Sequence, residues 1–467
     1  MRINLFGLGL SSKSPYVTAK GMQNMYAETR PAGEKSMMVA YKTPGLDLFS
    51  DTGVNIARGL YTFDKASAAY VVISNTFSQL SSLGALTNYG ALSTFAGRVS
   101  IADNGTQIMI VDGVYGYIFD TGTLAFTKIT DPDFPLNPTT VTFLGGRFVI
   151  SVASTGRFYA SDLYNGLSWD ALNFANAETN PDSIVSVWSS NGQLILLGDR
   201  SMEFWGNSGT LDFPFSLIQG TATEWGLAAR WSIAKFDNSF ACLVKNRMGQ
   251  VMVAEIAGYL PKKISTPDVD AIINSYDQVG DASAYSYMLG GHNMYVISFP
   301  SAGYTWLYDG STGMWSVLKS QGITRHLADF GISFLTNTIV ADYSTGKLYK
   351  LNPQTYTDNG AQIESEIVSE TITSPDLERF TVNNLRLDMA VGSGTSAVQT
   401  PQIGLSVSRD NGETWGAEML KNVGALGNYS NLVEWHRLGT ARNFVFKLRM
   451  TDPVGFTLVG ANINTAA

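Results

Sequence analysis

The feature that most constrains the fold is a hairpin pattern that recurs along the first three quarters of the chain. Each copy has an apolar run, a short polar turn, and a second run that often carries an aromatic residue. Successive first runs are centred 39 to 53 residues apart, about 45 on average. Seven copies occur, at residues 69–80, 108–120, 148–162, 194–206, 241–255, 294–309 and 338–351.

This period matches one β-propeller blade, because four short strands and their turns occupy about 40 to 50 residues. The hairpins therefore predict an all-β chain with a propeller of six or seven blades over residues 57–360. Outer strands are expected in segments such as 125–129 and 315–318, and loop insertions at 175–181 and 259–276. Other sandwiches and irregular β folds stay open as alternatives, since hairpins at this spacing also occur in them.

A different alternation follows residue 356, and it predicts a C-terminal antiparallel β-sandwich of about 100 residues. Its strands are expected at 379–389, 403–407, 442–450 and 456–463. The predicted domains are thus an N-terminal segment, 1–56, that closes or braces the propeller, the propeller, 57–360, and the sandwich, 361–467. The best helix candidate is 267–276, with Asp268 expected to cap it.

Composition supports many strands and tight turns. Only 15% of the 467 residues are charged, against about 25% in an average domain, and glycine is abundant at 46 residues. The net charge of −8, with scattered acids, disfavours a protein that reads nucleic-acid sequence, because such proteins neutralise phosphates with Lys and Arg. No run approaches the ~20 apolar residues of a membrane span, so we expect no membrane insertion. Residues 1–10 form a poor signal peptide.

Candidate chemistry is sparse. His292, His326 and His436 show no metal-ligand spacing, and the lone Cys242 is expected to be a small buried hydrophobe. Residues 131–133 (Asp-Pro-Asp) lack the third acid and turn glycine of a calcium loop. No Gly-x-Ser-x-Gly elbow is present. We therefore predict no catalytic residue, no metal and no cofactor.

One local motif is more specific than the candidates above. Residues 408–415 match the Asp-box pattern, Ser-x-Asp-x-Gly-x-Thr-Trp. The motif forms the turn of a β-hairpin. We expect the Asp410 carboxylate to cap backbone N–H groups of this turn, Gly412 to take a positive φ, and Trp415 to pack on the sheet. Ser408 opens the motif. Asp boxes abound in sialidase-like propellers, which raises a glycosidase hypothesis, but a glycosidase also needs paired acids that nothing here singles out.

Two terminal stretches resemble a known family. Residues 23–28 (QNMYAE) and 41–46 (YKTPGL) are similar to the N-terminal signature of the tail hub or nozzle proteins of short-tailed bacteriophages, also called packaged-DNA stabilisation proteins. Residues 442–449 and 460–463 resemble that family's last two strands. The matching signature positions are Asn24, Tyr26, Pro44 and Gly45, whose implied role is structural, tying the terminus into a blade.

The resemblance implies a structural virion protein of the phage tail, made in the host cytoplasm, and not an enzyme. Family members form a hexameric ring below the portal and its adaptor ring, extend the DNA channel, retain the genome and pass it at ejection. Some also hold a tail needle or help seat tailspikes or fibres. A channel that passes double-stranded DNA without gripping it should avoid basic walls, so we expect a net negative lumen.

A binding module is the alternative function, in which propeller loop tips attach a fibre or grip host glycans. Aromatic residues would carry it, and the candidates are Trp169, Trp205, Trp225 and Trp306, each of which could equally be a blade-core residue.

Overall fold

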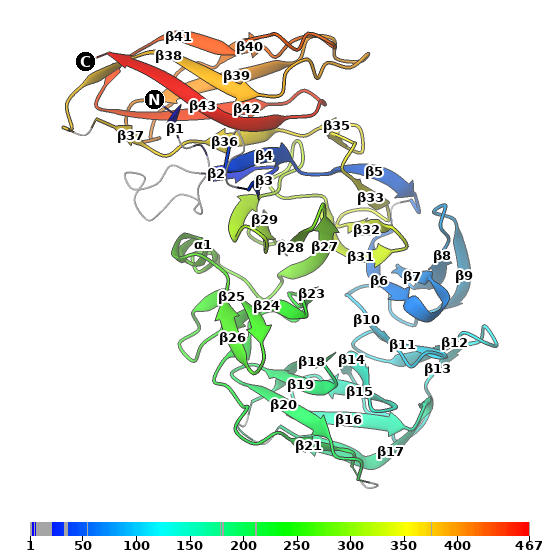
Figure 1. Ribbon diagram of the computed structural model, residues 1–467. Helices are drawn as coiled ribbons and strands as arrows, with labels where there is room; N and C mark the ends of the chain where they lie inside the picture. Colours follow the sequence, from blue (N-terminus) through cyan, green and yellow to red (C-terminus); the bar gives the residue numbers. More distant parts are fainter. Residues whose placement is uncertain are drawn as a thin grey trace.

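The computed structural model describes residues 2–3, 5, 21–31, 36–53, 55–177, 179, 182–210, 213–374 and 376–466. It has a ring of sheets below and a β-sandwich above, with both chain ends at the sandwich (Figure 1). The predicted fold class, a β-propeller followed by a β-sandwich, is confirmed. Among the described residues, seven antiparallel sheets form the ring, so the propeller has seven blades.

The first four blades are plain four-stranded sheets formed by consecutive strands. Blade 1 holds β6 (Ala57–Phe63), β7 (Ala68–Ile73), β8 (Thr76–Leu80) and β9 (Leu86–Ala91), with the 3-10 turn η1 at Asp64–Ala66. Blade 2 holds β10 (Ser100–Asp103), β11 (Gln107–Val111), β12 (Gly116–Asp120) and β13 (Phe126–Lys128). Blade 3 holds β14 (Pro138–Leu144), β15 (Arg147–Val152), β16 (Arg157–Asp162) and β17 (Asn165–Asn176). Blade 4 holds β18 (Ile184–Ser190), β19 (Gln193–Gly198), β20 (Met202–Asn207) and β21 (Phe215–Leu217).

The last three blades are less regular. Blade 5 holds β22 (Gly226–Leu227), β23 (Ala234–Phe236), β24 (Ser239–Lys245), β25 (Val251–Ala257) and β26 (Leu260–Lys263). Blade 6 holds β27 (Ser283–Leu289), β28 (His292–Phe299), β29 (Tyr304–Asp309) and β30 (Met314–Val317). Blade 7 holds β31 (Ala328–Phe334), β32 (Asn337–Asp342) and β33 (Leu348–Asn352), and its fourth strand is β5 (Gly45–Ser50) from the N-terminal segment. The short strands β34 (Thr357–Asp358) and β35 (Ala361–Gln362) extend this sheet.

The seven sequence hairpins are the two middle strands of the seven blades. Their apolar runs are continuous because each blade is buried on both faces. In β11, for example, Ile108 and Ile110 pack toward blade 1, whereas Met109 and Val111 pack toward blade 3. Every pair of neighbouring blades described in the structure shares one such hydrophobic cluster, including blades 7 and 1, which close the ring.

The sandwich draws strands from both ends of the chain. One sheet has the order β3 (Met25–Thr29), β4 (Met38–Lys42), β43 (Thr457–Ala466), β38 (Phe380–Met389) and β41 (Glu434–Ala441), with β1 (Arg2–Ile3) also on β43. The other has β36 (Ser365–Val368), β42 (Asn443–Met450), β39 (Gln402–Ser408) and β40 (Met419–Asn422), with β37 (Ile372–Thr373) on β42. A single cluster of buried residues fills the space between them.

Blade 6 and the sandwich belong to one sheet. Strand β2 (Gly21–Gln23) pairs with β30 on one side and with β36 on the other, so the strand order continues from β27 to β40. The N-terminal segment therefore reaches further than a brace of the propeller, because it also supplies β1, β3 and β4 to the sandwich.

Helix α1 (Pro267–Ile273) forms where the sequence predicted it, but its cap is Thr266, and the expected cap Asp268 is wrong. Thr266 Oγ1 accepts a hydrogen bond from the backbone N–H of Val269 at 3.3 Å. Proline at the first helical position places the cap one residue before it, which leaves Asp268 inside the first turn. The expected insertion at 259–276 contains β26 and α1.

Two expectations fall on parts of the chain that are not fully described. Residues 1, 4 and 6–10 of the signal-peptide candidate, and residues 178, 180 and 181 of the other insertion, lie outside the described residues. In the part of the chain that is described, no helix has the length and apolar character needed to cross a bilayer.

Candidate functional site

Asn24 fastens the N-terminal segment between the propeller and the sandwich. Its Nδ2 donates to the carbonyl oxygens of Lys319 and Glu364, both at 2.8 Å, and its Oδ1 accepts from Lys319 N–H at 2.9 Å. Asn24 has a φ of 52°, which asparagine tolerates better than most residues. One buried side chain thus joins the end of blade 6 to the segment that leads into the sandwich.

The other signature residues lie along the same segment. Tyr26 is paired with Tyr41 across β3 and β4, and its ring meets the edge of His292 in blade 6 at 5.4 Å between centroids. Burial, with Glu28 nearby, raises the pKa of Tyr26 to about 12. Pro44 is buried immediately before β5. A Cβ on Gly45 would lie 2.5 Å from the carbonyl oxygens of Thr355 and Thr357, so only glycine fits.

The Asp box forms a compact turn between β39 and β40. Asp410 Oδ1 accepts hydrogen bonds from the Ser408 hydroxyl at 2.6 Å and from Thr414 N–H at 2.9 Å, and these bonds lower the pKa of Asp410 to about 2. Gly412 has a φ of 95°. Trp415 lies under the Lys447 ammonium of β42, 4.5 Å from the ring centre. The carboxylate is therefore engaged within the turn.

The remaining sequence candidates have structural partners. Both carboxylate oxygens of Asp131 accept backbone N–H groups, from Asp133 and Trp169. His292 is buried 2.7 Å from Asp309, and Cys242 is buried, which raises the pKa of its thiol. Among the described residues, no group of three His, Cys, Asp or Glu side chains is placed to hold a metal ion.

The tryptophans proposed for glycan binding do not form an exposed platform. Trp169, Trp205 and Trp306 are each at most 4% exposed and belong to the clusters between blades, and Trp225 packs against the cluster of blades 4 and 5.

A site that the sequence patterns did not reveal lies on the propeller axis. The inner strands β6, β10, β14, β18, β27 and β31 surround a cavity of about 190 Å³, and a second cavity of about 430 Å³ adjoins it at the mouth between blades 1, 2 and 7. Arg58, Arg98 and Phe330 line both cavities. They therefore stand at the boundary between the mouth and the inner axis.

Bulges recur in the inner strands, and two of the bulged residues, Arg58 and Asp329, line the mouth. In four blades the pairing register between the inner strand and its neighbour shifts by one residue at the same position. As a result β6, β14, β18 and β31 each contain one residue without a partner in the ladder. A bulge turns the extra residue out of the regular ladder. The residues at these places are Arg58, Thr139, Val185 and Asp329.

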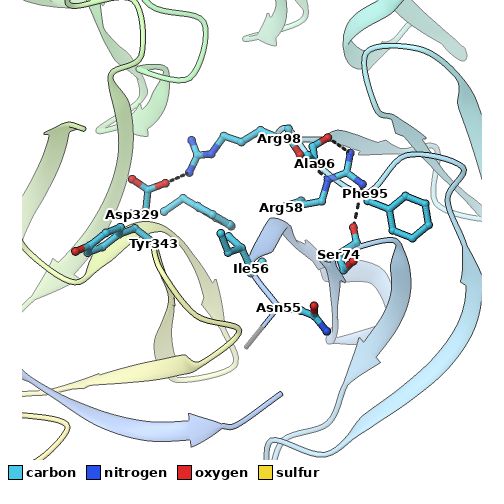
Figure 2. Close-up of a pocket in the computed structure, with 12 residues that line it drawn as sticks. Asn55, Ile56, Arg58, Ser74, Phe95, Ala96, Arg98, Asp329 and Tyr343 are labelled. Atoms are coloured by element: carbon cyan, nitrogen blue, oxygen red, sulfur yellow. Dashed lines mark hydrogen bonds and ion pairs between the residues drawn. The ribbon is translucent and has the colours of Figure 1, made fainter. Parts of the chain in front are cut away.

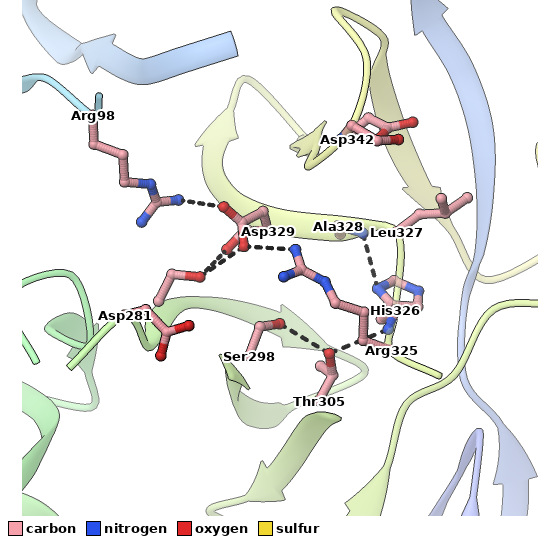
Figure 3. A network of polar contacts seen from close by, with 12 residues as sticks. Arg98, Asp281, Ser298, Thr305, Arg325, His326, Leu327, Ala328, Asp329 and Asp342 are labelled. Carbon is pink, nitrogen blue, oxygen red and sulfur yellow. Dashed lines mark hydrogen bonds and ion pairs between the residues drawn. The ribbon is translucent and has the colours of Figure 1, made fainter. Parts of the chain in front are cut away.

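Asp329 is the centre of an ionic network that joins three blades. Its Oδ2 lies 3.2 Å from Arg98 Nη2 of blade 2, and its Oδ1 lies 3.0 Å from Arg325 Nη2. Ser283 at the start of blade 6 donates to the same Oδ1 at 2.8 Å. Figure 3 shows Asp329 between the two guanidinium groups. Arg98 also stacks on Phe330, 4.2 Å from the ring centre.

Arg58 acts differently from Arg98. Its guanidinium donates to four backbone carbonyls, those of Ser74, Thr94, Ala96 and Gly97, and to the Thr94 hydroxyl. Figure 2 shows it turned toward the loop of Ala96 at the wall of the mouth. Arg58 thus holds the loop before β10, the loop from which Arg98 extends.

The family of this chain follows from comparison with known proteins. Residues 1–356 match the family model described as "Bacteriophage P22 Gp10, beta-propeller", and residues 367–466 match the model described as "Bacteriophage P22 Gp10, beta-sandwich". No curated protein matches the sequence.

Solved structures similar to this chain include three at low identity. The extracellular domain of a hybrid two-component system from B. thetaiotaomicron has 8% identity and a TM-score of 0.44, covering 65% of this chain. This chain spans only 39% of that protein's length. The Pan2 WD40 domain of Neurospora crassa has 7% identity and a TM-score of 0.43, covering 66% of this chain and 96% of that one. The WD40 beta propeller domain of Doa1 has 10% identity and a TM-score of 0.41, with coverages of 66% and 96%.

Proposed function

The chain belongs to the bacteriophage P22 Gp10 family, the tail hub or packaged-DNA stabilisation proteins of short-tailed phages, and from this membership we propose that it forms a hexameric hub in the virion tail. In this role the ring lies below the portal adaptor, extends the DNA channel, retains the packaged genome and passes it at ejection. The match of both domains to one family of phage structural proteins is the observation that carries the proposal.

The strands shared by the two domains support a role in which the protein must keep its shape under the pressure of the packaged DNA. Strand β5 closes the propeller by pairing with β33, and β2 continues the sheet of blade 6 into the sandwich. Because the two domains share strands, they cannot separate without breaking backbone hydrogen bonds. A hub that contains pressurised DNA benefits from such coupling.

The low charge supports a permanent ring and a smooth channel. Charged residues are depleted in the cores of large interfaces, and only 15% of this chain is charged. With a net charge of −8, the chain can line a channel that repels the DNA backbone. A surface potential calculated for the assembled ring tests this part, since a continuous Lys and Arg stripe facing the axis would contradict it.

The proposed partners are the portal-adaptor ring, further copies of the chain, and a tail needle, tailspike or fibre. Double-stranded DNA passes through without sequence-specific contact, and the protein does not insert into a membrane. Catalysis has no place in this role.

Imaging by negative stain tests the proposal most directly. The purified chain, alone and mixed with portal-adaptor rings, is expected to form six-fold rings that dock on the adaptor. Since the hexamer can depend on the adaptor, the mixed sample decides. A chain that stays monomeric with the adaptor present, or that binds glycans or releases sugar as a monomer, would overturn it.

A further inference from the structure

The axial cavities carry an excess of positive charge in an otherwise acidic protein. The charged side chains that line them are three cations and one anion, Arg58, Arg98, Arg230 and Asp329. Arg325, which lines neither cavity, also forms an ion pair with Asp329. Burial lowers the pKa of Arg58, Arg98 and Arg230, and this shift is opposed by Asp112 at Arg58 and by Asp329 at Arg98. Buried charges are normally paired, so this excess calls for an anion.

Arg98 has donors left for such an anion. Within the described residues, Asp329 is its hydrogen-bond partner, through Nη2 alone, so Nε and Nη1 carry hydrogens that no described residue accepts. The side chain is 18% exposed and held flat against Phe330. Buried Nε of Arg325 also lacks a partner among the described residues. Nε and Nη1 lie on opposite sides of the guanidinium, so a bidentate edge for an oxyanion consists of the second hydrogen of Nη2 together with the hydrogen of Nε or Nη1 beside it.

The mouth above Arg98 is apolar. Ile56 is 49% exposed and Phe95 is 67% exposed at the rim, and the rings of Phe330 and Tyr343 complete the wall. Figure 2 shows Ile56 and Tyr343 below the Arg98 to Asp329 ion pair, and Phe95 on the other side of Arg58. A volume of about 430 Å³ is within the range of small-molecule sites.

From these features we propose that the axial mouth binds an acidic organic ligand, with its carboxylate on the free edge of Arg98 and its apolar body against Ile56, Phe95 and Phe330. A carboxylate suits the single guanidinium edge that is free, whereas a fully hydrated phosphate would need more donors than the apolar wall offers. The carboxylate can come from a free acid or from the C-terminal residue of a protein segment. The site is independent of the proposed ring, because each chain contains it whole.

Titration calorimetry on the full chain tests the ligand class. The probes are phenylacetate, its uncharged analogue phenylacetamide, inorganic phosphate, and the dipeptide acetyl-Gly-Phe with a free or an amidated C-terminus. We expect phenylacetate to bind at least tenfold more tightly than phenylacetamide and phosphate. Tighter binding of the free-acid peptide than of phenylacetate identifies a protein segment as the source, and the reverse identifies a small acid. Equal binding of acid and amide, stronger binding of phosphate, or no binding by either acid would overturn the proposal.

Variants locate the site. Arg98→Gln is expected to weaken phenylacetate binding about tenfold or more, whereas Arg200→Gln, at a side chain 75% exposed in blade 4, should change nothing. Asp329→Asn removes the competing charge and should tighten binding several-fold, which a purely structural role would not produce. Phe95→Ala, at an exposed rim residue, should weaken binding without affecting folding. Unchanged binding in both Asp329→Asn and Phe95→Ala contradicts the site even where Arg98→Gln fails to fold.

Discussion

The propeller and the sandwich bury their apolar residues in opposite ways. The propeller divides its core into clusters between neighbouring blades, each built from about two hairpins. The sandwich has one core, and this core includes Met25, Ala27 and Ala40 from the N-terminal segment. The propeller is thus a ring of similar interfaces, whereas the sandwich depends on strands from opposite ends of the chain.

The two regions should therefore respond differently to a mutation in the core. Damage in the propeller should stay near one interface, because each cluster contacts only two blades. Damage in the sandwich should spread over its whole core and reach the N-terminal strands.

Phenylalanine truncation in each region should have the largest effect. Phe119→Ala in the cluster of blades 1 and 2, and Phe444→Ala in the sandwich core, are each expected to cost about 3 to 5 kcal/mol. Hydrogen exchange should rise mainly in blades 1 and 2 for the first variant, and across the sandwich, including β3 and β4, for the second. Leu172→Ala, at a side chain 79% exposed, is the control. An equal rise in all blades after Phe119→Ala would contradict the contrast.

Asn24→Ala should loosen the connection between the two regions. It removes three hydrogen bonds of a buried side chain and leaves a φ of 52° on alanine, which together are expected to cost about 2 to 4 kcal/mol. Thermal unfolding should shift down, and limited proteolysis should cleave faster near residues 355–375. Asn359→Ala is the matched control, because Asn359 has a φ of 50° in an exposed turn. Equal losses in both variants would assign the effect to backbone strain alone.

Gly45→Ala should weaken closure of the ring at blade 7. The new methyl group would overlap the carbonyl oxygens of Thr355 and Thr357, and β5 would have to move, at an expected cost of about 1 to 3 kcal/mol. The urea midpoint measures this cost. Gly206→Ala in blade 4 has room for the methyl group and should be neutral. A neutral Gly45→Ala would show that β5 is not tightly held.

The smallest effect is a pH dependence at Lys42, on the sandwich side of the N-terminal segment. Burial lowers the pKa of Lys42 from 10.5 to about 8, although its ammonium donates to the carbonyl of Asp452 at 2.7 Å. Between these two pKa values the unfolded chain binds more protons than the folded one, so stability should rise with pH. The expected gain is about 1 kcal/mol from pH 8 to pH 9.

Urea unfolding at the two pH values measures this gain, and Lys42→Met should abolish it. A stability of the unaltered protein that falls from pH 8 to pH 9 would contradict the assignment.

Much of the fold could be predicted because each blade carries its own local signal. The hairpin at residues 108–120, for example, consists of two continuous apolar runs, because both of its faces are buried. The pairing of Ala40 with Leu458 could not be predicted, because nothing in an alternating strand specifies a partner more than 400 residues away. The sequence pattern predicts the wrong helix cap because two residues that can both cap, Thr266 and Asp268, flank Pro267, and proline at the first helical position selects Thr266.

The axial site left no pattern in the sequence. The bulge residues Arg58, Thr139, Val185 and Asp329 occupy one structural position but share no side-chain type. Arg98 and Asp329 are 231 residues apart and meet only when blades 2 and 7 flank blade 1 in the closed ring. Each residue alone reads as an ordinary surface charge.

Strand β5, which closes the propeller, cannot pair with β33 until most of the chain has been synthesised. Its partner contacts include Asp47 with Asn352, which are 305 residues apart. At about 5 to 20 residues per second, a ribosome needs roughly 15 to 60 s to make the intervening chain. During that interval β33, the partner of β5, has not yet been made. The sheet of β3 and β4 lacks β43 for longer still. The sheet that contains β3 and β4 is therefore completed only after β43 has been synthesised.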